Sequence, residues 1–114
     1  MVPPGNITIV GASRGGIISA YVSTMLQEKR LNYVFLAGLF EKYLDDENLK
    51  LYGNVLSIHD QSDKLSITPA LYFQRSEGLG KFRKIVLNLN IGHGLVYKPH
   101  QEWIDHLLEW VKTK

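Results

Sequence analysis

The sequence predicts an α/β fold with an open parallel sheet of four strands joined by βα crossovers. Four short segments rich in branched and aromatic residues alternate with segments of helical character, which is typical of consecutive βαβ units. The length of 114 residues fits one domain, and a hydrophobic content of 45% is sufficient for a buried core. We therefore expect a single domain over residues 1–114.

The first strand and the first helix are expected on either side of a glycine-rich turn. Residues 7–10 are apolar and branched, as in a strand that is buried on both faces of a parallel sheet. A tight turn follows at residues 11–15, and a helix is expected from there to about Arg30. The buried stripe of this helix is predicted to consist of Ile18, Tyr21, Val22 and Met25.

The remaining elements continue the alternation. Three more strands are expected, at residues 33–37, 54–59 and 84–90. The acidic run at residues 45–47 indicates a solvated loop or a short helix end. Thr68 and Pro69 are typical of a helix start, because threonine caps helices and proline suits the first helical position. That helix is expected to end near Glu77, and a last helix is expected from Pro99 onward.

Composition excludes several classes of function. The formal net charge is only +2, and no basic run is interleaved with aromatic residues, so neither nucleic acid nor a membrane is an expected partner. The chain has no cysteine, which removes disulfides and thiolate metal sites. Residues 1–5 lack the basic and apolar regions of a signal peptide, and no apolar run approaches membrane-spanning length. A cytoplasmic location is expected.

Ser13 lies at the centre of a G-x-S-x-G pattern between the first strand and the first helix. This context exposes a serine on a sharp, strained bend, and the small residues Gly11 and Gly15 would let strand and helix approach closely. The start of the helix directs free backbone N–H groups and its positive dipole end toward negative charge beside the serine.

The same residues admit two other interpretations. Residues 11–17 resemble the phosphate-binding turn of short-chain dehydrogenases, and a close-packed turn with an incidental serine would use the same glycines. The chain has no Tyr-x-x-x-Lys pair, and the second predicted strand leads into Ala37-Gly-Leu-Phe40 rather than into an acidic ribose contact. These absences count against the dehydrogenase interpretation, and no cofactor is expected.

Reactive side chains follow three of the four predicted strands. Ser13 follows the first, Asp60 and Asp63 follow the third, and His93 follows the fourth. The carboxyl ends of parallel strands share one edge of a sheet, so these side chains are expected to meet there. A serine needs a histidine to take its proton, and the histidine needs a carboxylate to orient it.

The other three histidines are weaker candidates for a functional role. His59 lies beside Asp60, so an alternative is a metal cluster of His59 with Asp63 and His93. No metal-ligand spacing along one element supports this alternative, and no metal is expected. His100 and His106 are expected to be surface or packing residues of the last helix.

The order serine, acid, histidine resembles that of the α/β-hydrolase family, and the resemblance is to the C-terminal half of that fold. The stretches that resemble the nucleophile elbow, the acid loop, the histidine turn and the closing helix are residues 7–16, 54–63, 92–94 and 102–112. The resemblance implies that Ser13 is the nucleophile, Asp63 the acid and His93 the base. It also implies that the backbone N–H of Arg14 is an oxyanion donor. Asp60 stands where the family usually has glycine and is kept as the reserve acid.

The function implied is hydrolysis of small esters. The strands that precede the elbow in the family are absent, and with them the loop that supplies the second oxyanion donor. Loss of one donor lowers rates by ~10²–10³, so weak activity is expected. The alternative is a non-catalytic fragment or interaction module that self-associates. The first strand would lie at an edge, apolar and uncharged, so a homodimer through this edge is expected.

Overall fold

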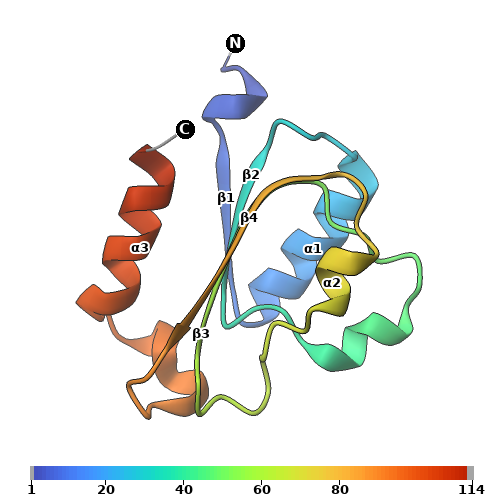
Figure 1. The fold of residues 1–114 in the computed structure, drawn as a ribbon. Coiled ribbons are helices and arrows are strands. Elements are labelled where there is room, and N and C mark those ends of the chain that lie inside the picture. Colours follow the sequence, from blue (N-terminus) through green and yellow to red (C-terminus); the bar gives the residue numbers. More distant parts are fainter. Residues whose placement is uncertain (1, 113–114) are drawn as a thin grey trace.

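The computed structural model describes residues 2–112, which form an open sheet with helices on both faces (Figure 1). The four strands are β1 (Thr8–Ala12), β2 (Asn32–Leu36), β3 (Gly53–Asp60) and β4 (Leu79–Leu87). Each strand is parallel to its neighbour, and their order in the sheet follows their order in the chain. The predicted α/β fold with an open parallel four-stranded sheet is confirmed.

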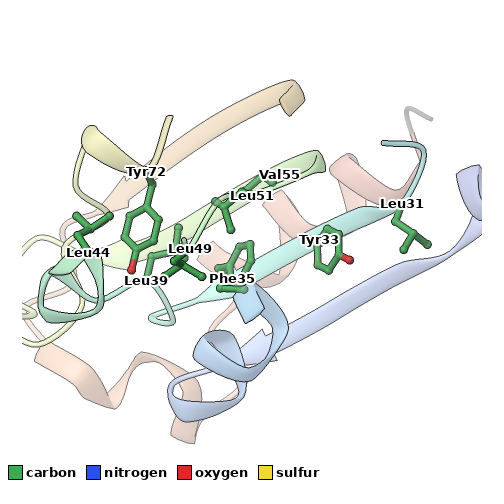
Figure 2. Packing of buried hydrophobic residues seen from close by; sticks show 10 residues of the cluster. Leu31, Tyr33, Phe35, Leu39, Leu44, Leu49, Leu51, Val55 and Tyr72 are labelled. Carbon is green, nitrogen blue, oxygen red and sulfur yellow. The ribbon is translucent and has the colours of Figure 1, made fainter. Parts of the chain in front are cut away.

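The helices divide between the two faces of the sheet. Helices α1 (Arg14–Leu26) and α2 (Leu71–Gln74) lie on one face, and α3 (Gln101–Lys112) lies on the other (Figure 1). All residues of β2 are buried, because side chains that alternate along an interior strand enter both cores. Tyr33 and Phe35 join the core that includes residues of α1 and α2 (Figure 2), whereas Val34 and Leu36 pack in the core with Trp110 of α3.

Strand β1 is less covered than the sequence suggests. Among the described strands it pairs only with β2, and Val10 is 48% exposed. The expectation of burial on both faces is therefore wrong for this strand. Ile7 and Ser13 bond to β2 through their backbone groups, and since the ladder alternates, the backbone groups of Thr8, Val10 and Ala12 point away from the sheet.

Helix α1 turns its small residues toward the sheet, and the predicted apolar stripe is wrong at Ile18 and Met25, although Tyr21 packs against the core as expected. Its buried residues are Gly16, Ser19, Ala20 and Ser23, whereas Ile18 and Met25 are 66% and 80% exposed. The cause is the close approach of the helix to the loop after β2. A Cβ atom on Gly16 would lie 2.4 Å from the Cα atom of Gly38. Large side chains on this face would push the helix away from the sheet.

Helix α1 is also shorter than predicted. It ends at Leu26 rather than near Arg30, because Gln27 adopts a left-handed conformation (φ 52°) and its N–H donates to the carbonyl oxygen of Ser23.

In the second half of the chain, two elements, α2 and β4, have other boundaries than the sequence predicts. Helix α2 is one turn long, and Thr68 does not cap it. Thr68 is buried with φ 48°, and its hydroxyl lies within hydrogen-bonding distance of Ser57 and His59. Strand β4 begins at Leu79, well before the predicted residue 84, and it ends at Leu87. The charged, exposed residues 81, 83 and 84 concealed the first part of this strand.

Candidate active site

Ser13, His93 and Asp63 form one chain of hydrogen bonds at the carboxyl edge of the sheet. Ser13 Oγ lies 2.7 Å from His93 Nε2, and His93 Nδ1 lies 2.8 Å from Asp63 Oδ2. Ser13 directly follows β1, Asp63 lies in the loop after β3, and His93 lies in the 3₁₀ helix Gly92–Tyr97 after β4. The parallel topology thus brings together residues that are far apart in the sequence. Such a chain is able to pass the serine proton to the imidazole.

The backbone of Ser13 is held in an unusual conformation. Its φ of 53° and ψ of −119° lie outside the regions that ordinary residues favour. Strain of this kind costs of order 1–3 kcal/mol and persists only where neighbouring structure enforces it. Here the Ser13 N–H donates to the carbonyl oxygen of Leu36 at 2.9 Å, and the Ser13 carbonyl oxygen accepts from the N–H of Gly16 at 2.9 Å. These contacts from both sides fix the bend that presents the hydroxyl.

Two glycines allow α1 to start this close to β1. A Cβ atom on Gly11 would lie 2.6 Å from both the carbonyl oxygen of Gly15 and Ser19 Oγ. A Cβ atom on Gly16 would likewise lie too close to Gly38, at 2.4 Å from its Cα atom. Gly15 does not have the expected role, since a Cβ atom placed there would meet no described atom within 4 Å. The close approach therefore depends on Gly11 and Gly16, and Gly15 contributes only its backbone.

Asp63 is buried, and both of its carboxylate oxygens accept hydrogen bonds. Its Oδ1 accepts hydrogen bonds from the N–H groups of Leu65 (2.8 Å) and Ser66 (3.1 Å), which leaves Oδ2 for His93. A carboxylate only accepts hydrogen bonds, so His93 Nδ1 donates to it. The lone pair of Nε2 is then directed at the Ser13 hydroxyl. This is the tautomer that a general base requires.

Asp60, the reserve acid, faces a different part of the structure. It is buried, and its carboxylate accepts hydrogen bonds from the N–H groups of Leu89 (2.7 Å) and Ser62 (3.1 Å) and from the Ser62 hydroxyl. Burial acts to raise the pKa of Asp60, but these bonds and one from the N–H of Ile91 outweigh it, and the pKa is lowered. The structure places Asp63, and not Asp60, against His93.

Ser62 has a role at the site that the sequence analysis did not assign. Its Oγ donates to Asp60 and accepts a hydrogen bond from the Gly92 N–H at 2.8 Å. The loop after β3 is thereby tied to the turn that carries His93. The pattern Asp-x-Ser, which favours local turns with side-chain to backbone bonds, is the sequence signal for this role.

The other histidines lie outside this chain of hydrogen bonds. His59 is buried, and its Nδ1 lies 3.0 Å from Thr68 Oγ1. Burial lowers the pKa of His59, and the positive charge of Lys84 lowers it further. His100, directly before α3, and His106, within α3, are half-buried. Across residues 2–112, no group of three or more histidine, aspartate or glutamate side chains is placed to hold a metal ion.

A cavity of about 550 Å³ opens over Ser13 and His93. Apolar and aromatic side chains form part of its wall, namely Ile17, Phe40, Tyr43, Leu65 and Tyr97. The Phe40 ring is tilted against the His93 ring, with 5.8 Å between the ring centres. Charged side chains form the rest of the wall, namely Arg14, Glu41, Lys42 and Lys64. The cavity is large enough for a small organic molecule next to the Ser13 hydroxyl.

The start of α1 offers backbone donors beside Ser13. The first N–H groups of a helix have no acceptor within the helix, and they form the positive end of its dipole. Arg14 is the first residue of α1 and directly follows Ser13. Its N–H is therefore available to an oxygen that becomes negative next to the Ser13 hydroxyl.

No protein-family model matches the chain, and no curated protein matches it either. Within residues 2–112, every helix is too short or too polar to cross a bilayer.

Proposed function

We propose that this protein is a serine hydrolase of the α/β-hydrolase type that cleaves small esters. The observation that carries the proposal is the 2.7 Å contact between Ser13 Oγ and His93 Nε2. The bond from His93 Nδ1 to Asp63 supports it, because a carboxylate in this place stabilises the imidazolium that forms when serine loses its proton. The strained bend at Ser13 supports it as well, since backbone strain of this kind is concentrated at functional sites.

In the proposed mechanism, Ser13 Oγ attacks the carbonyl carbon of the ester while His93 Nε2 takes the hydroxyl proton. The carbonyl oxygen becomes negative and accepts a hydrogen bond from the Arg14 N–H. His93 then gives its proton to the leaving alcohol, and an acyl group remains on Ser13. A water molecule, deprotonated by the same imidazole, releases the acid and restores the serine.

Activated esters are the expected substrates, and amides are expected to react poorly. We identify one backbone donor for the oxyanion, at Arg14, and the loss of a single donor lowers the rate of such enzymes by ~10²–10³. A good leaving group lowers the charge that must be stabilised at the carbonyl oxygen. We therefore expect slow turnover of aryl esters.

A fluorophosphonate probe tests this proposal, because it labels serines that an adjacent base has activated. We expect one adduct per chain, mapped by mass spectrometry to Ser13, and no adduct in Ser13→Ala. Ser19→Ala, which removes a buried hydroxyl one turn further along α1, is the matched control and should still be labelled. Labelling that persists in Ser13→Ala, or none in the folded wild-type protein, would refute the proposal. Tight binding of NADPH would instead favour a dehydrogenase.

A second candidate function is that of a non-catalytic module that self-associates. The observation that favours it is the open edge of β1, where the backbone groups of Thr8, Val10 and Ala12 point outward and the Val10 side chain is exposed. Open, uncharged edges are sites of strand pairing. Two copies related by a two-fold axis would join their β1 strands into one eight-stranded sheet.

A further inference from the structure

We propose that the cavity over Ser13 selects esters whose acyl chain ends in a carboxylate. This inference rests on the proposed ester hydrolysis and names the class of ester. Three cationic side chains, Arg14, Lys42 and Lys64, line the cavity that contains Ser13 and His93. An anionic group on the substrate is the natural counterpart of such a wall.

Among the described residues, no ion pair neutralises Arg14, Lys42 or Lys64 at the cavity. Within residues 2–112, the ion pairs join Arg30 to Glu28, Arg83 to Glu109 and His93 to Asp63. Of the residues that the structure describes, Glu41 is the one carboxylate that lines the cavity, so three cations less one anion leave a charge of +2 on the wall. Asp63 lies beneath His93, where three N–H groups already compensate its charge.

The three cations come from three separate segments that converge on the serine. Arg14 directly follows Ser13, Lys42 lies in the 3₁₀ helix Glu41–Asp45 after β2, and Lys64 follows Asp63 in the loop after β3. They therefore reach the cavity from three different segments, whereas a solvated charge run would extend along one element. The positive end of α1 faces the same space.

The remaining lining suits an unbranched acyl chain. Ile17, Phe40 and Leu65 provide apolar surface in the same cavity, where methylene groups lose contact with water. The Lys42 ammonium lies 5.2 Å from the centre of the Tyr43 ring, a cation–π contact that holds this charge at the wall. An acyl group with an ester at one end and a carboxylate at the other would contact the apolar residues with its methylene groups and the cationic residues with its carboxylate.

Three p-nitrophenyl esters of equal chain length separate charge from size. They are the hexanoate, which is neutral, the monoester of adipate, which is anionic, and the ω-aminohexanoate, which is cationic. We expect kcat/KM to be highest for the adipate and lowest for the aminohexanoate. The difference between adipate and hexanoate is expected to be about 3–10-fold at low salt, as for two or three solvent-exposed charge contacts. It should shrink in about 0.5 M NaCl, where such contacts are screened.

Removal of two cations tests whether these residues cause the preference. In the double variant Lys42→Gln/Lys64→Gln, the ratio of kcat/KM for adipate to that for hexanoate should fall toward one. Lys29→Gln is the matched control, because it removes an exposed lysine beyond the far end of α1, and it should keep the wild-type ratio. Equal rates for the three esters, or a ratio that the double variant retains, would overturn the inference.

A binding measurement separates this inference from the hydrolase proposal. Ser13→Ala labelled with ¹⁵N is titrated with adipamate, which carries a carboxylate, and with neutral hexanamide. We expect adipamate to shift the backbone amide signals of Arg14 and Lys64 at lower concentration than hexanamide does. If adipamate binds more tightly than hexanamide but the wild-type protein does not hydrolyse the esters, the hydrolase proposal is refuted and the carboxylate preference is not. Equal shifts by both amides, or shifts by neither, would refute the carboxylate preference.

Discussion

The hydroxyl of Ser62 accepts a hydrogen bond from the N–H of Gly92, the residue before His93, at 2.8 Å. The same hydroxyl donates to the buried carboxylate of Asp60. Asp60 and Ser62 therefore brace the turn that carries the proposed base, although neither residue contacts the Ser13 hydroxyl. We regard both as positioning residues.

Loss of the Ser62 hydroxyl should impair the site more than the fold. In Ser62→Ala the N–H of Gly92 loses its acceptor, and one such hydrogen bond contributes about 1 kcal/mol. We expect the rate of fluorophosphonate labelling at Ser13 to fall about 3–10-fold, with a small decrease in Tm. Gln61→Ala, a change at the exposed neighbouring residue, serves as control. A labelling rate equal to that of the wild type would show that the brace does not position His93.

Asp60 should make the stability of the fold depend on acid pH. Its hydrogen bonds hold the pKa below the ordinary value of 3.8, so the folded state favours the carboxylate. This contribution is complete above that value and is lost as the pH falls below about 4 and through the lower folded pKa. Urea unfolding at a series of pH values should show a loss of stability in this window for the wild type. Asp60→Asn should be less stable at pH 7 and less sensitive to acid, and an unchanged slope would contradict this assignment.

Alanine at two adjacent glycines should have different effects on stability. Gly16→Ala places a Cβ atom 2.4 Å from the Cα atom of Gly38, and such overpacking costs about 1–3 kcal/mol or more. Gly15→Ala meets no described atom within 4 Å, so it should be neutral or should stabilise the helix by up to about 1 kcal/mol. Chemical denaturation measures both. Equal losses in the two variants would mean that α1 does not approach Gly38 this closely.

The open edge of β1 should support dimerisation at micromolar concentration. Sedimentation velocity is expected to show a dimer for the wild type. Thr8→Pro should yield a monomer, because proline removes an N–H that points away from β2 while leaving the pairing of Ile7 and Ile9 intact.

Ile67→Lys, which changes an exposed apolar residue outside β1, is the control for this prediction and should remain dimeric. A wild-type monomer, or a dimer that persists in Thr8→Pro, would exclude association through this edge.

The position of each predicted site residue could be inferred from the sequence because the parallel topology dictates it. Ser13, Asp63 and His93 follow strands whose carboxyl ends must lie at one edge. The choice between Asp60 and Asp63 was beyond the sequence, since it depends on loop geometry and not on strand order.

The orientation of α1 was mispredicted because hydrophobicity is a poor guide where a helix lies very close to a sheet. Ile18 and Met25 suggested the buried face, but the contact between Gly16 and Gly38 admits only small side chains there. In the same way, polar residues at the start of β4 concealed a strand whose pairing with β3 is a backbone property. Tertiary contact overrode local pattern in both cases.

The order of the strands has a consequence for the protein during its synthesis. Each strand pairs with the one made just before it, so the sheet is able to grow as the chain leaves the ribosome. Ser13 and His93 are 80 positions apart, which corresponds to roughly 4–16 s at the usual rate of translation. For that interval the nascent chain carries the serine without its histidine partner. In the proposed chemistry, the newly made protein is therefore inactive until its final segments have emerged and docked.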